Sequence, residues 1–125
     1  LNFGHTFAHS YEATLGYSKK LNHGEAVILG IKSACEFSFK NKILNKVDYK
    51  LIRDHIIRIN KSLNLNKFFS KKDVNRIVKF TTVDKKNISE KINLILLKKI
   101  GKPTYKNFYK VSYLKKFIKN QFNNN

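Results

Sequence analysis

Two histidines near the start of the chain, His5 and His9, lie four residues apart in the run GHTFAH. On a helix, residues at this spacing share one face and sit one turn apart. Two imidazoles placed in this way can bind one metal ion, or one can bind a metal while the other meets a substrate. The spacing alone is a weak signal, so both roles are hypotheses at this point.

A third histidine opens the run His23-Gly24-Glu25, at the predicted start of another helix. Gly24 allows close backbone approach, and a helix N-terminus favours anions. Glu25 is equally well explained as ordinary helix chemistry, because a negative side chain stabilises the first turn. If the two histidine helices pack antiparallel, His23 lies near the end of the first helix rather than beside His5, unless the connecting turn folds back.

Three other groups carry weaker signals. Asp84, Lys85 and Lys86 follow a predicted helix, where two lysines ordinarily form a solvated helix end. Near an active site the same lysines could hold a phosphate or a carboxylate. His55 lies on an apolar helix face, where we expect a packed or partly buried structural histidine. Cys35 lies in an apolar helical stretch, where we expect a packed small hydrophobic residue.

The two helices that carry the histidines are predicted from local signals. The first covers about residues 3–16, with Asn2 as N-cap, Gly16 as the C-terminal stop, and Phe7 and Tyr11 in the core. A polar turn over 17–22 leads to a second helix over about 23–41. Its apolar residues recur at helical spacing, namely Val27, Ile28, Ile31, Ala34, Cys35 and Phe39.

The remaining elements complete a mainly α domain. A third helix is predicted over about 48–63, and its expected buried face consists of Leu51, Ile52, His55, Ile56 and Ile59. Ser70 caps a fourth helix, with Asp73 at the third position as in a capping box.

The apolar run over 92–97 could be a strand or a buried helix, and we favour a strand that ends before Gly101 and Pro103. A last helix covers about 112–122. We therefore expect residues 1–125 to form one helical domain with a short extended segment.

The chain is strongly basic, with 26 Lys and Arg against 8 Asp and Glu, and a net charge of +18. Such a balance can indicate a small helical module that binds nucleic acid. The excess, however, accompanies many Asn, Ile and Phe residues, which share AT-rich codons with Lys, and the lysines are spread along every segment. Mutational bias therefore explains the charge better, and we expect no nucleic-acid partner.

Compartment signals are sparse but agree with each other. A single cysteine excludes an intrachain disulfide and fits a reducing cytosol. The sequence has no signal peptide and no apolar run long enough for a membrane span. We expect a soluble, cytoplasmic protein without a membrane partner.

The order of the motifs resembles that of the 3-dehydroquinate synthase family. The matching runs are 1–9, Glu12-Ala13, Gly16-Tyr17 and 23–27, and the blocks at 84–86 and 100–102 are similar to later blocks of the family. The resemblance implies the helical metal- and substrate-binding C-terminal domain of a two-domain enzyme.

The enzyme would be an NAD-dependent lyase of the shikimate pathway, which makes aromatic amino acids. It would convert 3-deoxy-D-arabino-heptulosonate 7-phosphate to 3-dehydroquinate and phosphate, with a divalent metal, usually zinc or else cobalt. The whole enzyme is expected to be a homodimer.

The resemblance also implies roles for individual residues. His5 and His23 would be metal ligands, and His9 would lie near the substrate phosphate and move protons. The other expected substrate contacts are Asn2 and Lys85 or Lys86, of which we prefer Lys85 for a catalytic role.

The chain departs from the family pattern in several places. Ala8 replaces a common glycine, Ser10 and Tyr11 replace smaller or aliphatic residues, and the turn before His23 carries an extra residue. The chain begins at Leu1, which we interpret as a cut, and lacks the family's NAD-binding domain with its glutamate ligand. We predict that the chain alone is inactive. Related sugar phosphate cyclases and metal-dependent polyol dehydrogenases are alternative identities.

Overall fold

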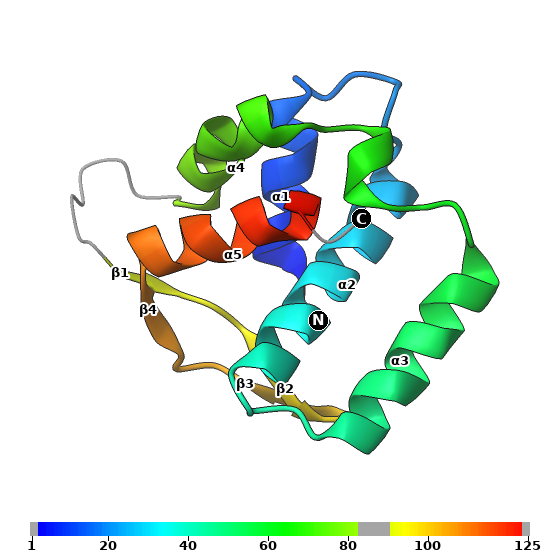
Figure 1. The fold of residues 1–125 in the computed structure, drawn as a ribbon, viewed down its shortest axis with the longest axis vertical. Helices are drawn as coiled ribbons and strands as arrows, with labels where there is room; N and C mark the ends of the chain where they lie inside the picture. Colours follow the sequence, from blue (N-terminus) through cyan, green and yellow to red (C-terminus); the bar gives the residue numbers. More distant parts are fainter. Residues whose placement is uncertain (1–2, 83–90, 124–125) are drawn as a thin grey trace.

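Helices make up most of the fold in a computed structural model, which describes residues 3–82 and 91–123 (Figure 1). They are α1 (His5–Thr14), α2 (His23–Lys40), α3 (Lys46–Ile59), α4 (Val74–Thr81) and α5 (Val111–Asn123), with single 3-10 turns at Leu65–Lys67 and Lys71–Asp73. The predicted mainly α class is confirmed. Across the described residues, no helix combines the length and the apolar character needed to cross a bilayer.

A close glycine contact sets where α1 begins. Gly4 adopts a left-handed conformation with φ of 77°, so α1 starts at His5 and not at residue 3 as predicted. Gly4 packs against Gly30 of α2, where an added Cβ would lie 2.4 Å from the Gly4 carbonyl oxygen and 2.8 Å from the Ala8 amide nitrogen. A side chain at position 30 would therefore force the two helices apart. Asn2, the predicted N-cap, lies outside the described residues.

The end of α1 follows the prediction. Gly16 adopts φ of 66° just beyond the helix. Its amide donates to the Ala13 carbonyl at 3.0 Å, and the Tyr17 amide donates to the Glu12 carbonyl at 2.9 Å. These two bonds form a Schellman motif, which satisfies carbonyls that the helix leaves open. The stop at Gly16 is confirmed.

Asparagine caps begin α2 and α3. The Glu25 amide donates to Asn22 Oδ1 at 2.8 Å, and the Asn22 amide donates to Glu25 Oε1 at 3.0 Å, so a capping box starts α2. Asn45 accepts from the Asp48 amide at 2.8 Å and starts α3 two residues earlier than predicted. The same helix ends at Ile59, four residues before its predicted end.

The predicted buried face of α3 is wrong in part. Leu51 is 56% exposed, Ile59 is 55% exposed, and His55 is exposed, whereas Tyr49 and Ile56 are buried. Its main helix contact is with α2, and the buried residues of α3 form a narrow stripe through Tyr49 and Ile56. The apolar residues beside that stripe line an open groove, whose opposite wall includes Ile28 and Ile31 of α2. The expectation that His55 is a packed residue is corrected for the same reason.

The predictions for the fourth and the last helix agree more closely with the structure. The amide of Ser70 donates to Asp73 Oδ2 at 2.9 Å, as expected of a capping box, and a 3-10 turn at 71–73 leads into α4. The last helix begins one residue before its predicted start and ends one residue after its predicted end.

The extended segment is a bent hairpin. Its strands are β1 (Lys91–Asn93), β2 (Leu96–Lys99), β3 (Lys102–Thr104) and β4 (Phe108–Lys110), and β1 pairs with β4 while β2 pairs with β3, both antiparallel. The Asn107 side chain donates to the carbonyls of Leu94 and Thr104 at 2.8 Å, which bridges the bend. The predicted strand is confirmed, although it is split in two and its partner strands were not predicted.

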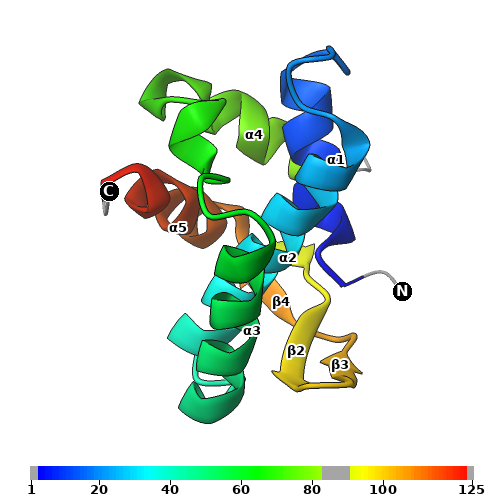
Figure 2. The same cartoon turned by 90° about the vertical axis from the view of Figure 1, so that its right-hand side faces the viewer.

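Side-chain contacts attach the hairpin to the helices. The Leu97 amide donates to Ser38 Oγ of α2 at 3.0 Å, and the Ile100 amide donates to Asp48 Oδ2 of α3 at 3.2 Å. Gly101 turns the tip with φ of 83°. Figure 2 shows the tip beside α2 and α3.

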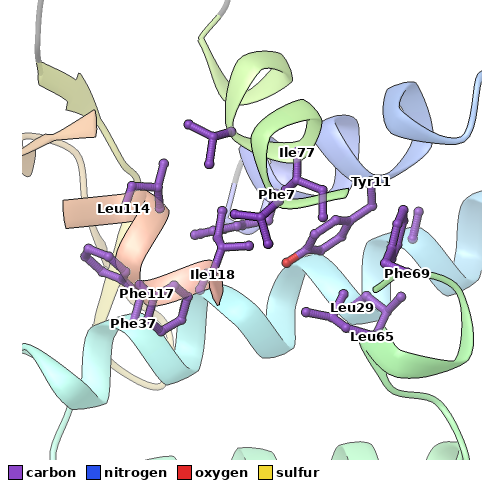
Figure 3. Packing of buried hydrophobic residues seen from close by; sticks show 14 of the residues in the cluster. Phe7, Tyr11, Leu29, Phe37, Leu65, Phe69, Ile77, Leu114, Phe117 and Ile118 are labelled. Atoms are coloured by element: carbon purple, nitrogen blue, oxygen red, sulfur yellow. The ribbon is translucent and has the colours of Figure 1, made fainter. Parts of the chain in front are cut away.

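The main core lies between α1, α2, α4 and α5 (Figure 3). Phe7 and Tyr11 are buried in it, as predicted, and Phe37 of α2 meets Phe117 of α5 edge to face at 4.9 Å between ring centroids. Cys35 is free and buried in a second, smaller cluster, which confirms its expected packing role. These contacts cover one side of α1 and leave the opposite side open.

Candidate metal and substrate site

The open side of α1 carries His5, His9 and Glu12. Their spacings of four and three residues place them on one helical face. Both histidines are exposed, and their rings stack with centroids 6.4 Å apart and planes 9° apart. The predicted common face of His5 and His9 is therefore confirmed. The buried face of the same helix, through Phe7 and Tyr11, holds that arrangement in place.

His23 meets this face at its far end. Its Nδ1 lies 3.0 Å from Glu12 Oε2, and the His23 side chain is 77% exposed while that of Glu12 is 18% exposed. The capping box places His23 as the first residue of α2 and fixes its backbone. From the sequence, Glu12 was counted in a matching run but given no role, although its distance of seven residues from His5 is a recognisable same-face signal.

Helices α1 and α2 run antiparallel, which is the arrangement that would place His23 near the end of the first helix. Gly4 at the start of α1 packs on Gly30, whereas Glu12 in its last turn meets His23 at the start of α2. The backbones of His5 and Glu12 are separated by roughly 10 Å along the helix axis. His23 therefore lies beside the end of α1, and the sharing of one ion by His5 and His23 stays a prediction.

The donor chemistry fits zinc or cobalt, but the ligand set is incomplete. Imidazole nitrogens and carboxylate oxygens are ligands that both ions accept. A carboxylate on the second nitrogen of a histidine is also a common arrangement around a metal ligand. Within residues 3–82 and 91–123, however, no three His, Cys, Asp or Glu side chains gather closely enough to hold an ion. A further ligand is needed.

The structure favours a structural role for Glu25. One of its carboxylate oxygens accepts the Asn22 amide, so the side chain is part of the cap of α2. A Cβ added at Gly24 would meet only Asn22 Oδ1, at 3.4 Å, so no described neighbour requires a glycine there. The close approach expected at Gly24 is not seen among the described residues.

Tyr17 borders the histidine face and was not predicted to do so. It lies just after the Schellman glycine with φ of 57°, it is 63% exposed, and its ring centroid is 6.4 Å from that of His9. The sequence signal was its position directly after Gly16, where the helix stop turns the chain back. An exposed tyrosine here adds a hydroxyl and an aromatic edge to the site.

The remaining predicted substrate contacts fall beyond the part of the chain that the structure describes. Asn2, Asp84, Lys85 and Lys86 lie outside the described residues, so their roles stay predictions. The last residue described before the lysines is Thr82, which follows α4. That helix packs on α1.

Ser10 and Tyr11, which are larger or more polar than the residues common in the family, fit into the core. Ser10 Oγ donates to the Ile77 carbonyl of α4, and the Tyr11 hydroxyl lies 2.5 Å from Ser33 Oγ of α2. Burial raises the pKa of Tyr11 well above its usual range, and the hydrogen bond to Ser33 opposes part of that rise. Each added polar group has a partner, so the larger residues support the histidine helix.

Comparison with known families gives a match over residues 1–87, to the model described as 3-dehydroquinate synthase C-terminal. A 3-dehydroquinate synthase of Pelagibacter ubique (strain HTCC1062) is 54% identical over 97% of this chain and 33% of its own length. The synthase of Endomicrobium trichonymphae is 37% identical over 82% of this chain and 27% of its own length. The chain thus spans about a third of the length of these relatives.

Solved structures show the same fold. A crystal structure of 2-deoxy-scyllo-inosose synthase matches with a TM-score of 0.71 at 20% identity, over 95% of this chain and 31% of that one. A second structure of a synthase of this name is complexed with carbaglucose-6-phosphate, NAD+ and Co2+. It matches with a TM-score of 0.71 at 22% identity, over 95% of this chain and 32% of that one.

Proposed function

Because the chain belongs to the 3-dehydroquinate synthase C-terminal family, we propose that it supplies the metal- and substrate-binding part of such an enzyme. The proposed reaction converts 3-deoxy-D-arabino-heptulosonate 7-phosphate to 3-dehydroquinate with loss of phosphate. The 54% identity to the Pelagibacter ubique relative carries this proposal, since it spans nearly the whole chain. The chain covers a third of that relative, so activity is assigned to the chain together with the other two thirds.

His5 and His23 would hold a divalent metal, with one or more ligands supplied from outside the described residues. The bound metal would polarise the hydroxyl being oxidised and the resulting ketone, while NAD would accept a hydride and later return it. The exposure of both imidazoles supports this role, because their ring edges are open to a further ligand and a substrate. The Co2+ and NAD+ in the related 2-deoxy-scyllo-inosose synthase structure support the same choice of cofactors.

His9 would act on the phosphate side of the substrate. It lies one turn beyond His5 on the same exposed face, so a ligand held at His5 would extend past its ring. An imidazole can accept and donate a proton near neutral pH, which suits the loss of phosphate. Asn2 and Lys85 or Lys86 would bind hydroxyl and anionic groups of the substrate and orient it.

A chimera tests the proposal. The chain replaces the matching third of the Pelagibacter ubique relative, and phosphate release from the heptulosonate phosphate is measured with NAD and Zn2+. We expect turnover by the chimera and none by the 125-residue chain alone. His9→Ala should lower kcat by about 10²–10⁴-fold. His5→Ala and His23→Ala should lose bound metal.

His55→Ala provides the matched control, because His55 is an exposed histidine on α3 and not on the α1 face. It should leave kcat and metal content unchanged. A folded chimera that binds NAD and zinc but releases no phosphate would contradict the proposed reaction. Turnover by the isolated chain would contradict the assignment of the missing ligand to the other two thirds.

A further inference from the structure

We propose that Glu12 is a positioning residue that holds the His23 imidazole with its proton on Nδ1, so that Nε2 presents its lone pair. The inference rests on the proposed function in one respect, namely that His23 is a metal ligand. Its geometric basis is independent of any metal. The Glu12 carboxylate lies 3.0 Å from His23 Nδ1 across the junction of α1 and α2.

The chemistry of the pair sets the tautomer. An ionised carboxylate can only accept hydrogen bonds, so the ring nitrogen that faces it must be the donor. In a neutral imidazole the other nitrogen is then without a proton and free to bind a cation. Nδ1 is the nitrogen in contact with Glu12, so Nε2 is the nitrogen that remains available.

Both residues of the pair are held by their own helices. The Glu12 carbonyl accepts the Tyr17 amide at 2.9 Å in the Schellman motif, which fixes the backbone at the end of α1. His23 lies between Asn22 and Glu25, the two residues of the capping box that fixes the start of α2. The carboxylate therefore has a defined place from which to orient the ring.

The exposed fractions of the two side chains indicate that the Glu12 contact orients the His23 ring and does not bury it. The Glu12 side chain is 18% exposed, whereas the His23 side chain is 77% exposed. The ring is thus held at one edge while the rest of it stays open. A structural tie between α1 and α2 is the competing explanation, but those helices are already joined by the Gly4–Gly30 contact and the Tyr11–Ser33 hydrogen bond.

Nitrogen NMR of the metal-free chain tests the tautomer directly. With ¹⁵N-labelled histidine at mildly alkaline pH, each ring shows which nitrogen carries the proton. We expect His23 to be mainly the Nδ1–H form. Glu12→Ala should remove that bias. Glu12→Gln should weaken it while keeping the size of the side chain, because an amide can donate as well as accept. His55 serves as the internal reference in every spectrum.

Metal affinity gives the second measurement. In the chimera, Glu12→Ala should weaken Co2+ or Zn2+ binding by about 10–100-fold, as is typical when the partner of a metal-bound histidine is lost. A merely structural tie would leave metal affinity unchanged and lower only the unfolding temperature. Circular dichroism of each variant identifies any that fails to fold, and Glu12→Gln keeps the test decisive in that case.

The outcomes separate the two proposals. A His23 ring protonated on Nε2 in the unmodified chain, or the same tautomer populations in both Glu12 variants, would overturn the positioning role. A chimera that binds no metal while His23 keeps its Nδ1–H form would instead overturn the proposed function and leave the orienting contact intact.

Discussion

Single glycines determine how closely the histidine helix can sit on its neighbour. Gly30 lies in the middle of α2, where glycine is unfavourable for helix formation, and the space above it is filled by the backbone of Gly4 and Ala8. Ala8, which stands where the family commonly has glycine, is tolerated because position 30 has no side chain. The start of α1, and with it His5, depends on this contact.

We predict that Gly30→Ala lowers the free energy of unfolding by about 1–3 kcal/mol or more, because the new Cβ would meet backbone atoms that cannot swing aside. Gly24→Ala is the matched control in the same helix. Its Cβ would meet only Asn22 Oδ1 at 3.4 Å, so the change should be neutral or stabilise by up to about 1 kcal/mol. Urea unfolding measures both. Equal effects of the two changes would disprove the close-contact explanation.

Cys35 should make stability depend on pH in the alkaline range. Burial, helped by the charge of Glu36, raises the pKa of the Cys35 thiol to about 12. In the unfolded chain the thiol ionises near pH 8.5, as an ordinary cysteine does. The stabilisation that the buried, protonated thiol gives to the folded state is therefore complete below about pH 8.5. It is lost progressively as the pH rises toward about 12.

Between about pH 8.5 and 10, the Cys35 thiol should lower the free energy of unfolding by roughly 1–2 kcal/mol. Unfolding free energies measured across this range, for the chain and for Cys35→Ala, should differ in slope. The variant should be flatter, because the free thiol no longer contributes. Parallel curves for the two proteins would show that the buried thiol does not titrate as expected.

At the scale of elements, α3 has more apolar residues than the rest of the fold buries. Its apolar residues are consistent with a broad buried face, but the helix contacts α2 along a narrow stripe, and the Leu51 and Ile59 side chains are mostly exposed. The sequence signal was correct about helix formation and wrong about which side chains are covered. Which side chains of α3 are buried depends on where α2 lies, and the spacing of apolar residues along α3 does not specify that position.

We predict unequal costs for two isoleucines of α3. Ile56→Ala should lower the free energy of unfolding by about 2–4 kcal/mol, because Ile56 is only 7% exposed. Ile59→Ala should change it by less than about 0.5 kcal/mol, because Ile59 is 55% exposed. Chemical denaturation of both variants provides the comparison. A large loss at Ile59 would mean that this side of the helix is covered in solution.

For the whole molecule, the charge of +18 must be reconciled with the proposed enzyme role. A basic chain attracts any polyanion, so weak binding to nucleic acid is expected without being a function. A functional nucleic-acid module differs because its base contacts keep binding tight when salt screens the phosphates. The alternative raised by the composition can therefore be tested by salt.

We predict that binding of the chain to duplex DNA or RNA falls steeply with salt and is weaker than about 1 μM at physiological ionic strength. Fluorescence anisotropy across a salt series, with a scrambled duplex as control, measures this. Tight and sequence-dependent binding that survives physiological salt would favour the nucleic-acid module over the metal and substrate role.

Local features could be predicted from the sequence because they depend on neighbouring residues along the chain. The shared face of His5 and His9 follows from helical geometry, and the stop at Gly16 follows from its tolerance of a positive φ. The mainly α class followed from the same local signals, which occur in segment after segment. Boundaries were less certain, since α3 ends four residues before its predicted end.

Only the tertiary structure decided which residues meet across the fold. The contact between Glu12 and His23 joins two helices at their ends, and the pairing of β1 with β4 spans the bend at Asn107. The Glu12–His23 contact depends on how α1 and α2 approach one another, and the close backbone contact at Gly30 brings these two helices together. The sequence by itself predicted that His5 and His9 share one face of a helix and that His23 begins the next helix. Packing determined that His23 is oriented by Glu12, because that contact exists only once the two helices are brought together.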